Sequence, residues 1–200
     1  FSTQSTHKLL AGLSQASQIL VQDAENNKLD RDIFNEAYLM HTSTSPQYSI
    51  VASIDVAAAM MEAPGGTALV EESLMEALDF RRAMRKVDEE WGADWWFKVW
   101  GPDDLSEEGL EERDAWMLKA NEAWHDFGDL AEGFNMLDPI KATIITPGLD
   151  IKGNFSEKFG IPAAIVTKYL AEHGVIVEKT GLYSFFIMFT IGITKDRWNT

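Results

Sequence analysis

The sequence predicts a mixed α/β chain in two parts. Short apolar runs bounded by turn residues alternate with longer stretches in which apolar residues recur every three or four positions. These are the patterns of buried strands and of packed helices. With 46% hydrophobic residues and seven Trp, 200 residues can bury a sizeable core. The breaker Pro64-Gly65-Gly66 interrupts the pattern, so we divide the chain into residues 1–62 and 63–200.

Three elements are predicted in the first part. Residues 17–21 have the composition of a short strand, and residues 32–40 have helical spacing. The segment 50–61 is apolar nearly throughout, which predicts a mostly buried helix. Between the two helices, residues 41–46 form a polar loop that Pro46 ends.

The second part has the order helix, strand, strand, helix, strand, strand, which is typical of a small α+β domain with its helices on one face of a sheet. Its first helix, at 68–91, carries an apolar packing stripe at Val70, Leu74, Ala77, Met84, Val87 and Trp91. The other predicted elements are strands at 95–100, 140–146, 175–177 and 184–193 and a helix at 162–173. The acidic segment 103–114 predicts a solvated loop or a surface helix.

Composition excludes several classes of function. A net charge of −15 argues against nucleic acids and anionic membrane surfaces; it suits either simple solubility or attraction of a cationic small molecule. The absence of Cys excludes disulfides, thiolate zinc sites and a cysteine nucleophile. No His pair with nearby carboxylates has metal-ligand spacing, so we expect no metal. The apolar run 185–193 is too short to cross a bilayer as a helix, and we expect a cytoplasmic protein.

The segment Ser5-Thr6-His7-Lys8-Leu9-Leu10, with its continuation to Ser17, resembles the cofactor-lysine segment of the bacterial ornithine/lysine/arginine decarboxylases, which use pyridoxal 5′-phosphate (PLP). Further blocks match this family in the same order: 34–38, 40–42, 44–46, 50–53, 124–125, 137–141, 146–148, 160–164 and 177–181. The resemblance therefore extends over essentially the whole chain. An S-x-x-K pattern alone would indicate no more than a surface lysine.

The resemblance implies an α/β fold of a particular kind. Residues 1–62 would be the end of a fold-type-I PLP-dependent transferase large domain, and residues 63–200 most of the small α+β domain that follows. Family members are several times longer, so we expect this chain to be an internal segment. The upstream His and Asp that hold the PLP ring in the family would then lie outside it, and the segment would be inactive alone.

The resemblance also implies residue roles. Lys8 would hold PLP as a Schiff base and handle protons at the substrate carbon, because a lysine amine can exchange its imine for that of a substrate. Apolar Leu9 and Leu10 could provide a dry wall for it. Ser5 would bind the phosphate, and His7 would lie at the cofactor as a phosphate contact or a proton donor. For His7 a purely structural hydrogen bond is the alternative.

Two further positions concern the partner subunit and the substrate. Ser43 stands where the family usually has Thr, in a loop that reaches the phosphate of the neighbouring subunit; an ordinary helix-terminating turn is the alternative. Glu178 matches a Glu that lies near the active site in lysine-decarboxylating relatives, where it could meet a distal ammonium. An exposed carboxylate pairing with Lys179 is the alternative. The tail 192–200 is closer to arginine-type enzymes, yet we favour lysine because Glu178 has a physical reason to bear on charge recognition.

The expected function is PLP-dependent α-decarboxylation of a basic amino acid to its diamine with release of CO2. Lysine is favoured over arginine or ornithine. Another fold-type-I activity, such as an aminotransferase or aldolase, and an inactive regulatory or structural subunit are the alternatives. The expected partners are a small cationic amino acid and a second copy in a homodimer with shared active sites, which the family also assembles into rings. Acid resistance and polyamine supply would be its uses. We assign the Trp124-His125 pair to architecture.

Overall fold

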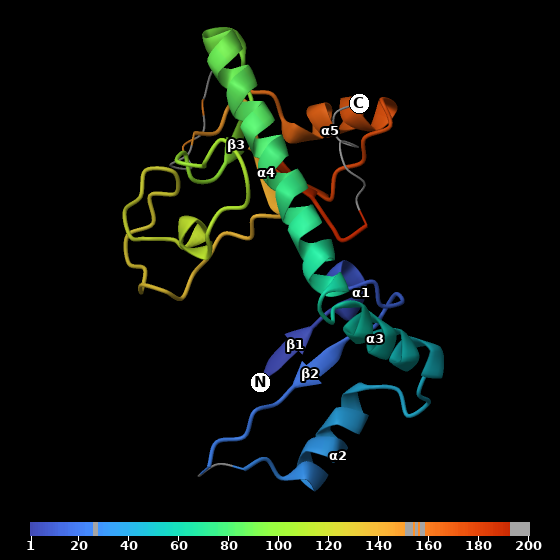
Figure 1. Cartoon of the computed structure of the whole chain (residues 1–200). Helices are drawn as coiled ribbons and strands as arrows, with labels where there is room; N and C mark the ends of the chain where they lie inside the picture. Colours follow the sequence, from blue (N-terminus) through green and yellow to red (C-terminus); the bar gives the residue numbers. More distant parts are fainter. Residues whose placement is uncertain (26–27, 151–153, 155, 157–158, 193–200) are drawn as a thin grey trace. The chain divides into compact units, whose positions relative to one another are not determined.

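The computed structural model describes residues 1–25, 28–150, 154, 156 and 159–192. The chain folds into two units, Phe1–Leu69 and Val70–Thr200. Each combines helices with a sheet, as the sequence predicts (Figure 1).

The first unit contains a two-stranded antiparallel sheet. Its strands are β1 (Ser2–Gln4) and β2 (Gln18–Leu20), paired so that Ser2 lies opposite Leu20. A single helical turn, α1 (Thr6–Leu9), follows β1 directly. The strand predicted at 17–21 is confirmed by β2. The partner strand β1 was not predicted, because three residues are too few to show an alternating pattern.

Two longer helices complete the first unit. The helix α2 (Arg31–His41) begins after Asp30, whose side chain accepts hydrogen bonds from the backbone N–H groups of Asp32 and Ile33 at 3.0 and 3.1 Å. Such a cap stabilises a helix by about 1 kcal/mol. The helix α3 (Tyr48–Met60) confirms the predicted position, but the expectation that it is mostly buried is wrong: Ala57 is its one buried residue. Apolar composition indicates that a helix can be buried by its neighbours, but within the first unit most of α3 stays exposed.

The second unit is built on a four-stranded antiparallel sheet. Its strand order is β3 (Lys98–Trp100), β4 (Lys141–Ile145), β6 (Ser184–Met188) and β5 (Lys179–Thr180). The helix α4 (Gly65–Trp91), most of which belongs to this unit, precedes the sheet in the chain, and α5 (Ala163–Glu172) follows β4. Two short 3-10 helices lie at Gly92–Asp94 and Arg113–Trp116.

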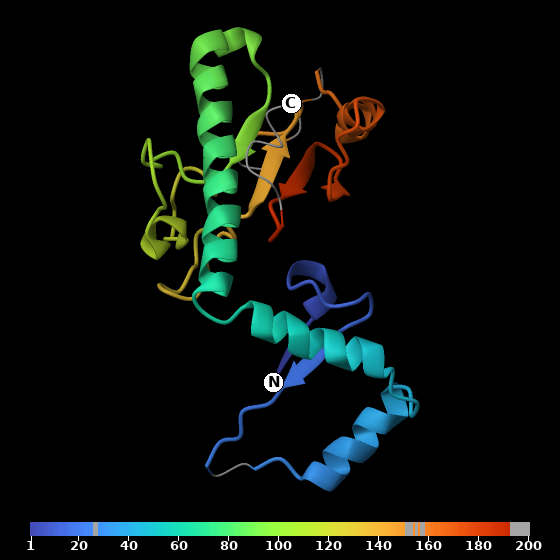
Figure 2. The same ribbon diagram turned by 45° about the vertical axis from the view of Figure 1, so that its right-hand side comes forward.

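Both helices of the second unit pack on the same face of the sheet (Figure 2). In β4, Ala142 and Ile144 point to this face because they are two residues apart. Ala142 belongs to the cluster that contains Ala77 of α4, and Ile144 to the cluster that contains Ala163 of α5. Phe189 is fully buried in the first of these clusters. The predicted order of elements, with helices on one face, is therefore observed.

Several details differ from the sequence prediction. The strand predicted at 175–177 lies instead at β5, Lys179–Thr180. The strand β6 ends at Met188, whereas the sequence predicted a strand that continues to residue 193. The predicted packing stripe of α4 is exposed at its ends, with Val70 38% and Trp91 58% accessible. The breaker at Pro64 also begins a helix, since α4 starts at Gly65 and the Ala68 N–H donates to the Pro64 carbonyl at 3.1 Å. Proline is favoured at helix starts because its missing N–H is not needed there.

A staple joins the end of β4 to the start of α5. Thr146, which is 1% exposed, donates from Oγ1 to the Ile161 carbonyl at 2.7 Å, and the Ile161 N–H donates to the Pro147 carbonyl at 2.8 Å. The ring of Tyr183 lies against two glycines: a Cβ added to Gly148 would be 2.7 Å from its Cε1, and one added to Gly160 would be 2.8 Å from the same atom. These contacts bring residues 146–148 and 160–161 together.

No helix within the described residues is both long and apolar enough to cross a bilayer.

Candidate active site

Lys8 lies on the single turn of α1. Its backbone N–H donates to the Ser5 carbonyl at 3.1 Å. Ser5 occupies the N-cap position of α1 without making a side-chain cap bond, and both residues are exposed. Leu9 is 37% exposed and Leu10 is half-buried, so within this unit the two leucines do not enclose the Lys8 amine. Across the described part of the chain, neither the Lys8 Nζ nor the Ser5 Oγ is engaged in a hydrogen bond or ion pair.

His7 is held by one backbone carbonyl. The Ala16 carbonyl oxygen lies 2.9 Å from His7 Nδ1 and accepts the His7 backbone N–H at 3.2 Å. The ring thus makes the structural hydrogen bond that we kept as an alternative for His7. Its other nitrogen, Nε2, contacts no hydrogen-bonding group among the described residues.

The loop that follows Lys8 in the chain, residues 10–17, is held by several hydrogen bonds. Ala16 is fully buried, and its N–H donates to the Leu13 carbonyl at 2.9 Å. The Leu13 N–H donates to Ser53 Oγ on α3, also at 2.9 Å. Gln18 Nε2 donates to Oγ1 of the buried Thr6 at 2.8 Å. The sequence prediction did not assign Ala16, Ser53 or Gln18 to the site.

The Ser43 hydroxyl takes part in a local turn. It accepts the Ser45 N–H at 3.1 Å and lies 3.4 Å from the Ser45 carbonyl. This is the turn that we kept as the alternative for the 41–46 loop. Both residues are exposed. The contact of Ser43 with a phosphate stays a prediction.

Glu178 lies at the edge of the second unit's sheet. Its backbone N–H donates to the Phe186 carbonyl of β6 at 3.1 Å, and its side chain is exposed. No ion pair joins it to Lys179 in the described structure. The arginine-like tail, apart from Gly192, lies outside the described residues. Since Lys8 and Glu178 belong to different units, the role of Glu178 in substrate binding stays a prediction.

His125 has a structural setting in the second unit. Its Nδ1 accepts the Phe127 N–H at 3.0 Å, so the ring hydrogen is on Nε2, which lies 3.3 Å from a Glu122 carboxylate oxygen. Partial burial acts to raise the pKa of Glu122. Hydrogen bonds from the Lys119 N–H, from His125 and from Trp124 outweigh it and lower this pKa below its ordinary value.

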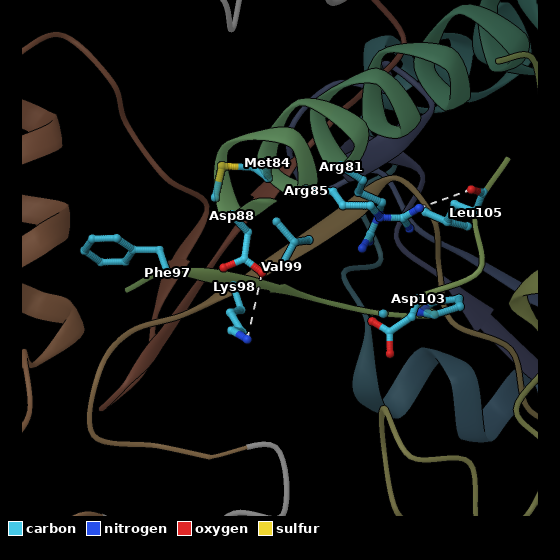
Figure 3. A pocket seen from close by; sticks show the side chains of 11 residues that line it. Arg81, Met84, Arg85, Asp88, Phe97, Lys98, Val99, Asp103 and Leu105 are labelled. Carbon is cyan, nitrogen blue, oxygen red and sulfur yellow. Dashed lines mark hydrogen bonds and ion pairs between the residues drawn. The ribbon is translucent and has the colours of Figure 1, made fainter. Parts of the chain in front are cut away.

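A cavity of about 130 Å³ lies between α4 and β3 (Figure 3). The Lys98 ammonium and the Asp88 carboxylate on its wall are 3.9 Å apart, and Arg85 Nη1 donates to the Leu105 carbonyl at 3.2 Å. Arg81 donates to the carbonyls of Trp100 and Lys141, each at 2.9 Å. Burial lowers the pKa of Arg81 to about 10, against the opposing effect of Asp138. None of the predicted site residues lines this cavity.

Within the described residues, no group of three or more His, Cys, Asp or Glu side chains could hold a metal ion.

The model of the family described as "Orn/Lys/Arg decarboxylase, major domain" matches residues 1–197. The chain belongs to this family. It is 54% identical over 201 residues to lysine decarboxylase LdcA of Pseudomonas aeruginosa, covering 100% of this chain and 27% of that protein. It is 38% identical over 217 residues to the biodegradative arginine decarboxylase of Escherichia coli, covering 100% of this chain and 28% of that protein.

The solved structure of lysine decarboxylase A from Pseudomonas aeruginosa has the same fold. It superposes with a TM-score of 0.83 at 54% identity, covering 98% of this chain and 26% of that one. The chain thus spans about a quarter of the length of the relatives it matches. The family resemblance inferred from the Lys8 segment is confirmed, and decarboxylases of basic amino acids are its relatives.

Proposed function

We propose that the protein to which this chain belongs catalyses PLP-dependent α-decarboxylation of a basic amino acid, with lysine preferred. The observation that carries this proposal is the family match through residues 1–197, which includes the Lys8 segment. The preference for lysine is supported by 54% identity to a lysine decarboxylase against 38% to an arginine decarboxylase. In this proposal residues 1–62 end a fold-type-I large domain and residues 63–200 form most of the small domain.

The residues at α1 fit such a cofactor. The Lys8 amine and the Ser5 hydroxyl are exposed, lie three residues apart on one turn, and are not engaged by other described groups. An amine that binds an aldehyde and a hydroxyl that donates to a phosphate oxygen are the groups that PLP requires. When bound, the cofactor would supply an electron sink for the electrons left behind as CO2 departs.

The residues of the chain divide the remaining tasks. Lys8 would hold the cofactor through Nζ and carry a proton at that atom. Ser5 would orient the phosphate, and His7 would lie beside both. Glu178, with its backbone fixed to β6, would offer its carboxylate to the distal ammonium of lysine. Ser43 would reach the phosphate held by the other subunit of a homodimer.

Exposed apolar side chains in the first unit support a larger assembly. Ile33 is 70%, Met40 80% and Tyr48 79% accessible, an exposure that is costly for side chains of this size. We propose that the rest of the parent protein and its dimer partner cover these side chains, that dimers join into rings, and that the segment alone is inactive. A cytoplasmic location, polyamine supply and acid resistance belong to the same proposal.

The test uses the complete protein with PLP. CO2 release is measured with lysine, arginine and ornithine, for the wild type, for Lys8→Ala and for Lys28→Ala, which removes an exposed lysine elsewhere in the same unit. We expect CO2 release to be fastest with lysine, to be lost in Lys8→Ala and to be kept in Lys28→Ala. Wild-type turnover in Lys8→Ala would refute the role of Lys8. Absence of CO2 from all three substrates, with PLP bound, would indicate another PLP reaction or a regulatory subunit.

The role of Glu178 has its own test. Glu178→Gln removes the charge and keeps the shape, and should lower kcat/KM for lysine at least tenfold more than for arginine, because the ion pair with the distal ammonium of lysine would be lost. Glu132→Gln, an exposed carboxylate in the same unit, is the control. Equal losses with both substrates would remove Glu178 as a specificity residue.

A further inference from the structure

The two nitrogens of the His7 ring have different surroundings. A carbonyl oxygen only accepts hydrogen bonds, so Nδ1, which lies 2.9 Å from the Ala16 carbonyl, must carry the ring hydrogen in neutral His7. The lone pair of the neutral ring is then on Nε2. The hydrogen bond that one ring nitrogen makes decides whether the other nitrogen of the neutral ring is a donor or an acceptor.

The loop that carries the Ala16 carbonyl is held by the burial of Ala16 and by a hydrogen bond to α3. Ala16 is fully buried, and the Leu13 N–H connects its loop to Ser53 on α3. Gly12 allows the loop to fold closely, since a Cβ added there would lie 3.0 Å from the Ala16 Cβ and 3.3 Å from the His7 nitrogen. The same carbonyl also accepts the His7 backbone N–H at 3.2 Å, which ties the ring and the backbone of His7 to one atom.

We propose that the Ala16 carbonyl is a positioning group that fixes His7 in the Nδ1–H tautomer. Nε2 is then the ring nitrogen that is left to accept a hydrogen bond or a proton. This inference rests on the proposed function, which puts the reacting groups at Lys8. In the neutral ring Nε2 accepts a hydrogen bond or a proton. Once protonated there, the ring donates from Nε2 while Nδ1–H keeps its bond to Ala16. The bond to Ala16 is kept in both protonation states, so the ring stays in one position whether Nε2 accepts or donates a hydrogen bond.

The chain contains an internal reference with the opposite arrangement. His125 Nδ1 accepts the Phe127 N–H at 3.0 Å, which leaves the ring hydrogen on Nε2. The two rings therefore differ in tautomer for reasons that the backbone around each explains, and a measurement that distinguishes tautomers must report them as different.

The tautomer is tested directly by ¹⁵N NMR of histidine-labelled complete protein without PLP. The difference between the wild type and His7→Asn isolates the His7 signals, and the difference between the wild type and His125→Asn gives the reference. We expect an Nδ1–H tautomer for His7 and an Nε2–H tautomer for His125. An Nε2–H tautomer at His7 would overturn the inference. This measurement needs no turnover, so it stands or falls independently of the decarboxylase proposal.

Two substitutions of His7 separate its two nitrogens. The Asn amide nitrogen takes the position of Nδ1, whereas the Gln amide nitrogen reaches that of Nε2. In His7→Asn, hydrogen exchange of residues 5–17 in PLP-free protein should stay at the wild-type rate, while turnover falls at least tenfold because Nε2 is gone. In His7→Gln the same amides should exchange roughly five- to tenfold faster, because one hydrogen bond is lost. Wild-type turnover in His7→Asn, or equal loss of protection in both variants, would contradict the proposal.

Gly12→Ala crowds Ala16, whose carbonyl holds the ring, and leaves the His7 side chain itself unchanged. The added Cβ would lie 3.0 Å from the Ala16 Cβ, so Ala16 must shift by a few tenths of an ångström, and we expect faster exchange of residues 5–17, a several-fold lower kcat and an unchanged KM for lysine. Gly65→Ala is the control, since a Cβ there meets nothing within 4 Å. An unchanged kcat together with faster exchange would show that the carbonyl supports the fold and does not position His7.

Discussion

Arg82 on α4 tests how the second unit holds the loop of residues 103–112. Its Nε donates to the Ser106 carbonyl at 2.9 Å and its Nη2 to the Gly109 carbonyl at 2.6 Å, while Nη1 pairs with Asp79 at 2.9 Å. Arg82 is 8% exposed. Arg82→Met keeps the packing of the aliphatic stem and removes all three polar contacts.

The magnitude follows from these contacts. Each hydrogen bond from the guanidinium to a loop carbonyl contributes about 1 kcal/mol. The ion pair adds about 0.5 kcal/mol at most, since the Asp79 side chain is 41% exposed. We therefore expect the loop to open about 2 kcal/mol more easily in Arg82→Met, which corresponds to roughly 30-fold faster exchange of its amides.

Hydrogen exchange with mass spectrometry on the complete protein measures this opening, because it resolves residues 103–112 from the rest of the chain. Lys86→Met is the matched control: it removes an exposed cation from the same helix and should change the opening free energy by less than about 0.5 kcal/mol. Asp79→Asn removes the ion pair alone and should have a similarly small effect.

A change of less than threefold in Arg82→Met would refute the reasoning, because the loop would then be held without the arginine. Equal effects in Arg82→Met and Lys86→Met would also refute it, since they would assign the change to the net charge of α4.

Three further predictions concern the second unit. Because the pKa of Glu122 is lowered on folding, its stabilising effect is present above about pH 4.5 and is lost as the pH falls through the lower folded pKa; Glu122→Gln should make the exchange of 117–137, around His125, less dependent on acid. Gly148→Ala, at a φ of +111° and against an aromatic ring, should lower thermal stability by about 1–3 kcal/mol more than Gly133→Ala, which has a positive φ in open space. Phe189→Ala should cost about 3–5 kcal/mol in denaturant unfolding of the second unit, because it empties a fully buried site; a loss below 1 kcal/mol would contradict the core described above.

Hydrophobic periodicity predicted most of the helices and strands. The segments 32–40 and 68–91 are long enough to show a helical period, and they appear as α2 and α4. The strand β5 was misplaced by a few residues because Lys179 and Thr180 carry no apolar signal, and their pairing with β6 is decided by backbone groups. The exposure of α3 could not be read from its composition, because composition does not say which neighbour covers a face.

The site was predictable only in part, for a similar reason. Lys8, Ser5 and His7 carry functional groups in their side chains, so a resemblance to known sequences can find them. The group that holds the His7 ring is the carbonyl of Ala16, and every residue has a carbonyl. Ser53 lies within a block that matches the family, but its bond to the Leu13 N–H requires knowing that the loop folds back onto α3.

The staple that joins Thr146 and Pro147 to Ile161 has a consequence for engineering. Its hydrogen bonds and the packing of Tyr183 join residues 146–148 to residues 160–161 directly, so the start of α5 is held to the end of β4 by contacts of its own. The register of α5 on the sheet is therefore set by residues 146–148 and 160–161 themselves, and an epitope tag inserted between Leu149 and Asp150 should leave it unchanged.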